Sequence, residues 1–405
     1  MRLAIVGRDR YIDQLVFAAL NSENIQVVLF YPDENEDQLS GVPSTEGWEG
    51  LAAETRVDAV LVASCTESTR ERRAEQLRML VQMDLPVLVV HPGCEAIVAF
   101  EIEMQAVADS VRLMTYQPWA AHPVWESAAD LISNPGSLGP IKQIVIERQL
   151  ENNDHQTALH ALAQDACIAR KLLGPIQRIG ALSSDASGLA SSPVQMIATG
   201  QPEGPTAQWS SLHLPPICDL RVQLIGSEAS ATLQWSDGQA PQWLVAGEEI
   251  PLPPFDAAKD ALDRLRTLKP GLTDWIEASR GTELAEAAER SGKRGRAVDL
   301  YEESHTEANT FKGVMAASGC MLLMMILLGF VIAAVVEGVR FPYAMKAHKQ
   351  RVKEAEKAGK VAMPDRYPLW IRLMPAYPII LFLLLQMLWF VAGQGSSTTR
   401  TVRRE

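Results

Sequence analysis

Short apolar runs alternate with charged segments of helical length over the first 118 residues. The runs are rich in β-branched residues and contain few polar residues, which is typical of strands buried on both faces of a parallel sheet. The segments between them are long enough to form the crossover helices that parallel strands require. We therefore predict a parallel sheet of five or six strands, including residues 3–6, 25–30, 59–63, 87–90 and 112–116.

The pattern changes after residue 118. Strands are now expected in succession, separated by turns rather than by regular crossover helices, which predicts an antiparallel sheet with helices on one face. We expect strands near residues 144–148, 176–182, 207–212, 218–225 and 231–235. Helices are expected at residues 119–133, 157–173, 273–288 and 295–306.

Two long apolar runs distinguish the last hundred residues. Residues 313–336 contain no charged side chain, and that length is sufficient for a helix to cross a bilayer. Residues 373–393 form a second run, with Pro375 and Pro378 near its start and Trp389 suited to a membrane interface. The sequence therefore predicts a two-helix membrane hairpin after residue 308.

The charge pattern leaves the topology of this hairpin open. The connecting segment 340–366 carries eight Lys or Arg and three acidic residues, a bias typical of cytoplasmic loops. The N-terminal sequence lacks the features of a signal peptide, so we also expect the main body to face the cytoplasm. Two full spans would put these parts on opposite sides. The alternatives are a translocated main body, an outward-facing loop or a re-entrant second run, and we favour a cytoplasmic main body.

Net charge and cysteine usage narrow the range of partners. The formal net charge of −12, with no basic surface indicated in the main body, argues against nucleic acid. The five cysteines are scattered without a C-x-x-C pair, so we expect reduced thiols and no metal site. Membrane lipid, a small-molecule ligand and a second copy of the chain are the partners that we expect.

Polar residues follow two central strands of the predicted parallel sheet. Ser64 and Cys65 come after residues 59–63, and His91 and Pro92 come after residues 87–90. In open α/β sheets, ligands bind beyond the carboxyl ends of the strands. We therefore expect these four residues to lie at the edge of the sheet where a ligand would bind.

The first strand and its turn retain part of a dinucleotide-binding pattern. Such a turn has the form G-x-G-x-x-G, in which glycines let the backbone approach a pyrophosphate at the N-terminus of a helix. Only Gly7 is present here; Arg8 could attract a phosphate, whereas Asp9 would repel it. Asp33 lies near the end of the second strand, where an acidic residue usually binds a ribose. A βαβ domain that binds no nucleotide is the alternative interpretation.

The order of several segments resembles the Gfo/Idh/MocA oxidoreductase family over roughly residues 1–308. The segments are VDAVLVAS followed by a helix and VLVVHP, then NPGSLGPI, KLLGPI, RVQLIGSEASATLQW and GRAVDLYEESHTE. The resemblance implies a Rossmann-like domain at residues 1–118 that binds NAD or NADP. It implies an α/β domain with an open antiparallel sheet at residues 119–308 that binds a sugar or polyol, followed here by a membrane region at 309–405.

The sequence departs from the family where hydride transfer requires proton exchange. The family's Glu-Lys-Pro motif is replaced by Val90, His91 and Pro92, and its His-x-x-Asp motif by Gln164 and Cys167. His91 could exchange the hydroxyl proton, since imidazole titrates near neutral pH, with Asp165 orienting it. The candidate catalytic residues are therefore His91 and Asp165. Cofactor contacts are expected at Gly7, Arg8, Asp33, Ser64, Cys65 and Pro92, and substrate contacts at Trp119 and Gln164.

Two functions follow from this combination of match and departure. The first is a membrane-anchored NAD(P)-linked oxidoreductase that transfers hydride with a sugar or polyol. The second is a catalytically degenerate relative that senses a ligand or docks a partner at a membrane. His91 could exchange a proton or contact a ligand. The alternative is that it has no functional role and only ends a strand before Pro92.

Overall fold

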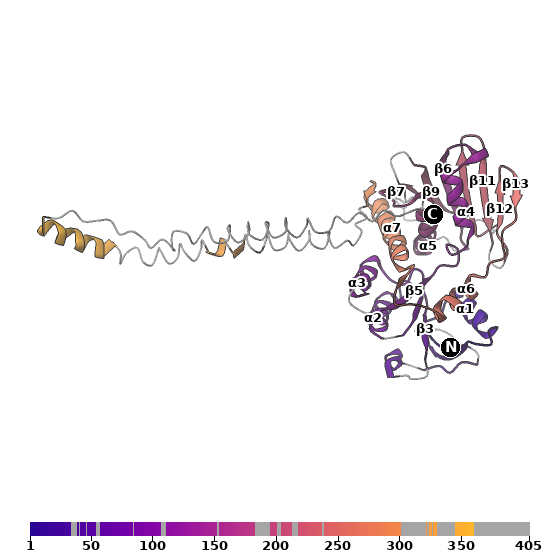
Figure 1. The fold of residues 1–405 in the computed structure, drawn as a ribbon, viewed down its shortest axis with the longest axis horizontal. Coiled ribbons are helices and arrows are strands. Elements are labelled where there is room, and N and C mark those ends of the chain that lie inside the picture. The colour runs from indigo at the N-terminus through magenta and orange to yellow at the C-terminus, as the bar shows by residue number, and fades with distance from the viewer. Residues whose placement is uncertain are drawn as a thin grey trace, which may run out of the picture. The chain divides into compact units, whose positions relative to one another are not determined.

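The computed structural model separates the chain into a compact unit, Met1–Glu302, and a second unit, Glu303–Glu405 (Figure 1). The structure describes residues 1–33, 39, 41–45, 47–53, 57–83, 85–106, 111–151, 154–182, 195–200, 204–212, 218–236, 239–300, 321, 324–325, 327–329 and 345–359.

The first sheet has six parallel strands in the order β14-β5-β4-β3-β1-β2. Its strands are β1 (Arg2–Val6), β2 (Gln26–Tyr31), β3 (Ala59–Val62), β4 (Val87–Val90), β5 (Arg112–Tyr116) and β14 (Gly271–Thr273). Alternate residues of one strand face opposite sides, so Leu3 and Ile5 pack in one core and Ala4 and Val6 in another. Burial on both faces explains the uniformly apolar runs in the sequence.

Helices cover both faces of this sheet. The first core includes α1 (Arg10–Leu20) and α6 (Ala257–Arg266), and the second includes α2 (Arg70–Leu80) and α3 (Ala96–Ala106). A 3₁₀ helix, η1 (Trp48–Ala53), adds Trp48 and Leu51 to the second core.

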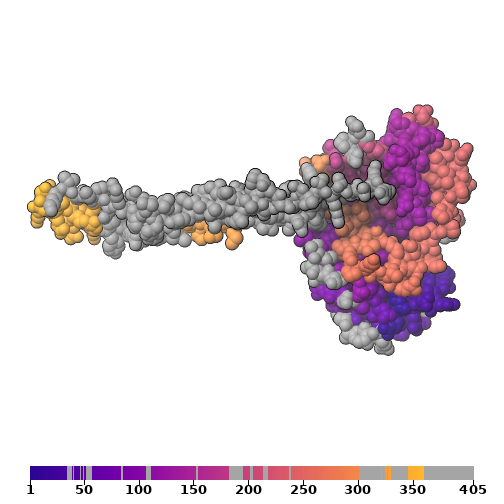
Figure 2. All heavy atoms as spheres, viewed as in Figure 1, coloured from indigo at the N-terminus to yellow at the C-terminus, as the bar shows by residue number. Residues whose placement is uncertain are grey.

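The chain returns to the first sheet late in the sequence, which corrects the prediction that residues 119–308 belong wholly to the second domain. Helix α6 packs in the same core as α1, and β14 pairs with β5 as the edge strand. Both elements are short, and β14 has only three residues, which explains why the apolar pattern did not reveal them. Figure 2 shows this orange part of the chain at the junction of the two halves.

The second sheet has nine strands in the order β13-β12-β11-β10-β6-β9-β8-β7-β15. It is mixed rather than wholly antiparallel, because β6 and β9 pair in parallel in register from Gln143 opposite Thr206. The strands are β6 (Ile141–Gln149), β7 (Arg178–Leu182), β8 (Gln195–Thr199), β9 (Thr206–Leu212), β10 (Leu220–Gly226), β11 (Ser230–Trp235), β12 (Gln242–Val245), β13 (Glu248–Ile250) and β15 (Val298–Asp299).

Three helices pack against the second sheet in one core: α4 (Val124–Ser133), α5 (His155–Leu173) and α7 (Trp275–Arg294). A short 3₁₀ helix, η2 (Gly136–Leu138), follows α4. The helix predicted from residue 119 begins only at Val124, because residues 118–122 form turns. The helix predicted at 295–306 is wrong over residues 295–300, where β15 pairs with β7 instead, and its remainder lies outside the described residues.

The predicted membrane runs lie largely outside the described residues. Of residues 313–336 the structure describes six, all helical, and of residues 373–393 it describes none. Residues 345–357 of the basic segment are helical and mostly exposed. Within the part of the chain that is described, no helix is both long and apolar enough to cross a membrane.

Candidate functional site

A cavity of about 770 Å³ lies where the carboxyl ends of the first sheet's strands face α5 and α7. Its lining combines residues from both halves of Met1–Glu302, as expected for a ligand site at the carboxyl edge of an open α/β sheet. Those that follow the strands or begin α1 include Asp9, Arg10, Tyr11, Ser64, Cys65 and Pro92. Those from the second half include Arg148, His160, Gln164 and Glu286.

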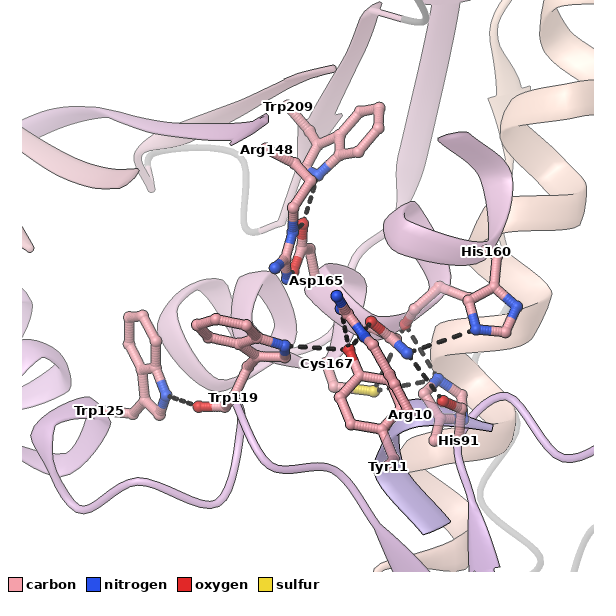
Figure 3. A network of polar contacts seen from close by, with 12 residues as sticks. Arg10, Tyr11, His91, Trp119, Trp125, Arg148, His160, Asp165, Cys167 and Trp209 are labelled. Atoms are coloured by element: carbon pink, nitrogen blue, oxygen red, sulfur yellow. Dashed lines mark hydrogen bonds and ion pairs between the residues drawn. The ribbon is translucent and has the colours of Figure 1, made fainter. Parts of the chain in front are cut away.

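The Tyr11 hydroxyl is the centre of a hydrogen-bond network at this cavity (Figure 3). It accepts from Arg10 Nη2 at 2.6 Å and from Trp119 Nε1 at 3.1 Å. It donates to Gln164 Oε1 at 3.1 Å. The two predicted substrate residues, Trp119 and Gln164, are therefore brought together through Tyr11, which the sequence did not single out.

Trp119 is not itself part of the cavity lining. The Arg148 guanidinium lies 4.7 Å from the centre of its ring, and Trp235 packs edge-on at 4.9 Å. The backbone of Trp119 is held by Trp125, whose Nε1 donates to the Trp119 carbonyl at 2.6 Å. Because its ring is packed against protein groups and is 5% exposed, the structure does not present Trp119 as a surface on which a sugar stacks.

His91 is buried and is not among the residues that line the cavity. The ring is 2% exposed, and Nε2 donates to the Ala163 carbonyl at 3.0 Å. Cys167 Sγ lies 3.8 Å from the same nitrogen. Burial lowers the pKa of His91 to about 4, outweighing the bond to Ala163, so the imidazole is neutral at pH 7.

The sequence predicted that Asp165 would orient His91. In the structure Asp165 pairs with a buried arginine instead. Its Oδ2 accepts from Arg148 Nε at 3.0 Å and from Trp209 Nε1 at 2.9 Å. Its Oδ1 accepts a second, shorter bond from Arg148 Nη2. Burial opposes the charge on Arg148, but Asp165 more than offsets this and the pKa of Arg148 is raised. Asp165 therefore holds Arg148 at the cavity and is not available to His91.

The first helix begins with a carboxylate that binds the donors at its N-terminus. Asp9 Oδ1 accepts from the backbone N–H of Tyr11 at 2.9 Å and of Ile12 at 2.8 Å. Asp9 Oδ2 accepts from Ser64 N–H, after β3, at 2.7 Å. Arg8 turns along the helix, where its Nε lies 2.8 Å from Asp13 Oδ1.

Asp33 is buried in an ion pair at the end of β2. Arg73 Nη2, from α2, lies 2.5 Å from Asp33 Oδ2. Arg73 is 1% exposed, and its Nη1 donates to Gln76 Oε1 at 2.6 Å and to the Val6 carbonyl at 3.3 Å. A Cβ added to Gly7 would overlap both Arg73 and Asp33, so these two side chains lie directly against the first glycine.

Solved structures share this arrangement of sheets, although no family model and no curated protein matches the sequence. A myo-inositol dehydrogenase from Corynebacterium glutamicum aligns with a TM-score of 0.58 at 16% identity, covering 75% of this chain and 99% of that chain. An aldose–aldose oxidoreductase from Caulobacter crescentus gives 0.59 at 17%, covering 74% and 99%. GenD2 from gentamicin A biosynthesis, solved with NAD, gives 0.59 at 18%, covering 75% and 97%.

The chain has the fold of the Gfo/Idh/MocA oxidoreductases. The resemblance predicted from the sequence is thus confirmed at the level of the fold, and the likeness spans nearly the whole length of those relatives. Gly7, Asp33, Ser64, Cys65 and Pro92 all follow the carboxyl ends of strands β1, β2, β3 and β4 of the first sheet.

The residues that would hold a dinucleotide in a Gfo/Idh/MocA fold do not fit one here. The helix N-terminus that would face the pyrophosphate already binds Asp9. The acidic residue that would bind the ribose, Asp33, is paired with Arg73. Ser64, Cys65 and Pro92 do line the cavity; burial raises the pKa of Cys65 to about 11, so its thiol is neutral at pH 7. Over the described part of the chain, no cluster of side chains suits a metal ion.

The sequence carried a weak signal for one of the missed residues. In β6, Ile144, Ile146 and Arg148 alternate with more exposed positions, so all three point inward. An arginine in an inward position of a strand indicates a buried partner of opposite charge. Arg73 gave no comparable signal, because its partner Asp33 is 40 residues away in the sequence.

Proposed function

We propose that this chain binds a small polar ligand in the cavity without transferring hydride, as a catalytically degenerate relative of the oxidoreductases. The position of His91 carries the proposal. A general acid or base must reach the reacting proton and have a pKa near the working pH. His91 is buried outside the cavity lining with its Nε2 bonded to Ala163, and its pKa is about 4.

A second histidine, His160, supports the same conclusion. His160 lines the cavity with Nε2 3.4 Å from Gln164 Nε2. Burial lowers its pKa to about 4, so it too is poorly matched to proton exchange at neutral pH. His91 itself, at the position where the family has lysine, is buried and does not line the cavity.

Charge in the cavity lining favours a neutral or cationic ligand. Seven carboxylates and four guanidinium groups line it, and three of the four guanidinium groups are paired with acidic side chains. An excess of carboxylates repels phosphates and attracts positive charge. A polyhydroxylated molecule, held by Tyr11, Gln164 and backbone groups, or an amine therefore suits the cavity better than a dinucleotide.

Membrane attachment belongs to the same proposal. Residues 313–336 form an uncharged run long enough to span a bilayer. Of its described residues, Met321, Met324, Met325, Leu327 and Leu328 are helical with side chains 59–72% exposed, as expected for side chains that face lipid. We propose membrane lipid as a partner, a main body on the cytoplasmic side, and self-association of the chain.

The alternative is an NAD(P)-linked oxidoreductase acting on a sugar or polyol. The likeness to GenD2, solved with NAD, and to an aldose–aldose oxidoreductase favours it. Titration of the full-length protein in detergent with NADH and NADPH, followed by fluorescence and calorimetry, separates the two functions. We expect no saturable binding at millimolar cofactor and no turnover with sugars.

Turnover would overturn the proposal, and a variant would show whether His91 is involved. His91→Gln should abolish turnover if the imidazole exchanges the proton. Gln164→Leu tests the proposal that the cavity binds a ligand. A polyol or amine should raise the melting temperature of the wild type but not of this variant, because Gln164 lines the cavity.

A further inference from the structure

We infer that the dinucleotide site of this fold is occupied by the chain's own side chains, with the Asp9 carboxylate in the place of a phosphate. This goes beyond the proposed function, whose central claim is that His91 cannot exchange the proton of hydride transfer, and it supplies a structural reason for the absence of cofactor binding expected there. Two observations carry it: the Asp9 carboxylate binds the N–H groups at the start of α1, and the Arg73–Asp33 ion pair lies directly against Gly7.

The Asp9 carboxylate satisfies the groups that otherwise bind a phosphate. The first N–H groups of a helix have no partner within the helix and attract anions. Here those of Tyr11 and Ile12 both donate to Asp9 Oδ1, and Ser64 N–H, from the neighbouring strand end, donates to Oδ2. Three donors from two elements thus converge on one carboxylate.

Asp9 stands where the fingerprint G-x-G-x-x-G has its second glycine, which allows the backbone to approach the pyrophosphate. A side chain at that position occupies the space of approach. Its negative charge would also lie against two phosphates in a site from which water is partly excluded, where like charges repel strongly.

The part of the site that would hold the adenosine ribose is closed by other residues than Asp9. Arg73 is 1% exposed and reaches over Gly7 to bond Asp33 Oδ2 and the Val6 carbonyl. Asp33, which would accept the ribose hydroxyls, is itself 6% exposed. Neither Gly7 nor Asp33 nor Arg73 lines the 770 Å³ cavity, so the cavity does not extend into this part of the site.

The test removes the carboxylate while keeping a helix cap. Asp9→Ser retains a side-chain oxygen that caps helices well but removes the negative charge and frees Ser64 N–H. Inorganic pyrophosphate is the probe, measured by calorimetry on the full-length protein in detergent. We expect the variant to bind pyrophosphate at least about tenfold more tightly than the wild type, as expected for removing one charge at a partly buried helix terminus.

Asp256→Ser is the matched control. Asp256 caps α6, where it accepts from Lys259 N–H at 3.0 Å in an exposed position. The substitution changes the same charge at the same type of cap without Gly7 beside it. If Asp256→Ser gained as much affinity for pyrophosphate as Asp9→Ser, the gain would be a general property of helix N-termini. That result would overturn the inference.

A second variant tests the ribose side. Asp9→Ser should not bind ADP-ribose better than pyrophosphate, because Arg73 still covers Gly7. Asp9→Ser/Arg73→Ala should bind ADP-ribose more tightly than Asp9→Ser does. If the double variant does not fold, the pyrophosphate comparison decides alone.

Two results would overturn the inference: wild-type protein that binds pyrophosphate as tightly as Asp9→Ser, or no gain in Asp9→Ser. In either case the proposed function still stands if the wild type shows no turnover. Turnover with NADH would remove the proposed function, whereas the pyrophosphate comparison would still decide the role of Asp9.

Discussion

His91 shows how one side chain links the stability of this protein to pH. In the unfolded chain its imidazole takes a proton near its ordinary pKa of 6.5, whereas in the folded protein burial lowers the pKa to about 4. Between these values the unfolded state binds more protons, so stability falls as the pH falls. Above pH 6.5 both states are neutral at this residue, and the stability is independent of its protonation.

His91→Gln should therefore flatten the pH profile of stability. The wild type should lose about 1.4 kcal/mol more per pH unit than the variant over much of the window from pH 6.5 to about 4. The free energy of unfolding, measured by denaturant titration at several pH values, gives both slopes. Equal slopes would mean that the folded imidazole is protonated as readily as the unfolded one, contrary to its burial.

Residue types at strand ends could be predicted from the sequence, but their partners could not. The positions of Ser64, Cys65 and Pro92 follow from strand direction, and all three line the cavity. The pairing of Asp165 with Arg148, instead of His91, depends on which face of α5 meets β6. That choice is made by packing between segments far apart in the chain, which no local pattern encodes.

The contact between α5 and α7 is the element-scale feature that fixes the surroundings of His91. The helices approach so closely at Gly281 that an added Cβ would lie 2.7 Å from Cys167 Sγ and 2.8 Å from the Ala163 carbonyl. Ala163 is also the hydrogen-bond acceptor of His91. A glycine is thus required here by close approach, although it lies within a helix.

Gly281→Ala should destabilise the protein by about 1–3 kcal/mol, because a methyl group must be forced between packed helices. Gly50→Ala is the matched control, since nothing lies within 4 Å of its added Cβ and the cost should stay within about 0.5 kcal/mol. Denaturant midpoints of both variants provide the comparison. An unchanged midpoint for Gly281→Ala would show that α7 shifts without cost.

Elements with a strong local pattern could be predicted, and those without one could not. The strands β3 and β4 are uniformly apolar because both of their faces are buried. In contrast, none of the three residues of β14 is buried, and the segment forms a strand only by pairing with β5. The parallel pairing of β6 with β9 likewise depends on the order of strands in space, which alternation within each strand does not specify.

The proposed membrane attachment is a prediction about the whole chain. If the proposal holds, the full-length protein should remain with the membrane after alkaline carbonate extraction, because the uncharged 24-residue run 313–336 is long enough for a helix to cross a bilayer. A chain ending at residue 302, the last residue of the first compact unit, should be released into the supernatant. Release of the full-length protein would contradict the anchor, and retention of the shorter chain would place the membrane contact in the main body.

The late return of the chain to the first sheet has a consequence for biosynthesis. Strand β5 ends at Tyr116, but its partner β14 begins only at Gly271. At typical rates of synthesis, about 10–30 seconds pass before the ribosome supplies that partner. During this interval one edge of the nascent sheet and the face that α6 will cover are open, so the first half of the protein needs protection from aggregation until the second half has been made.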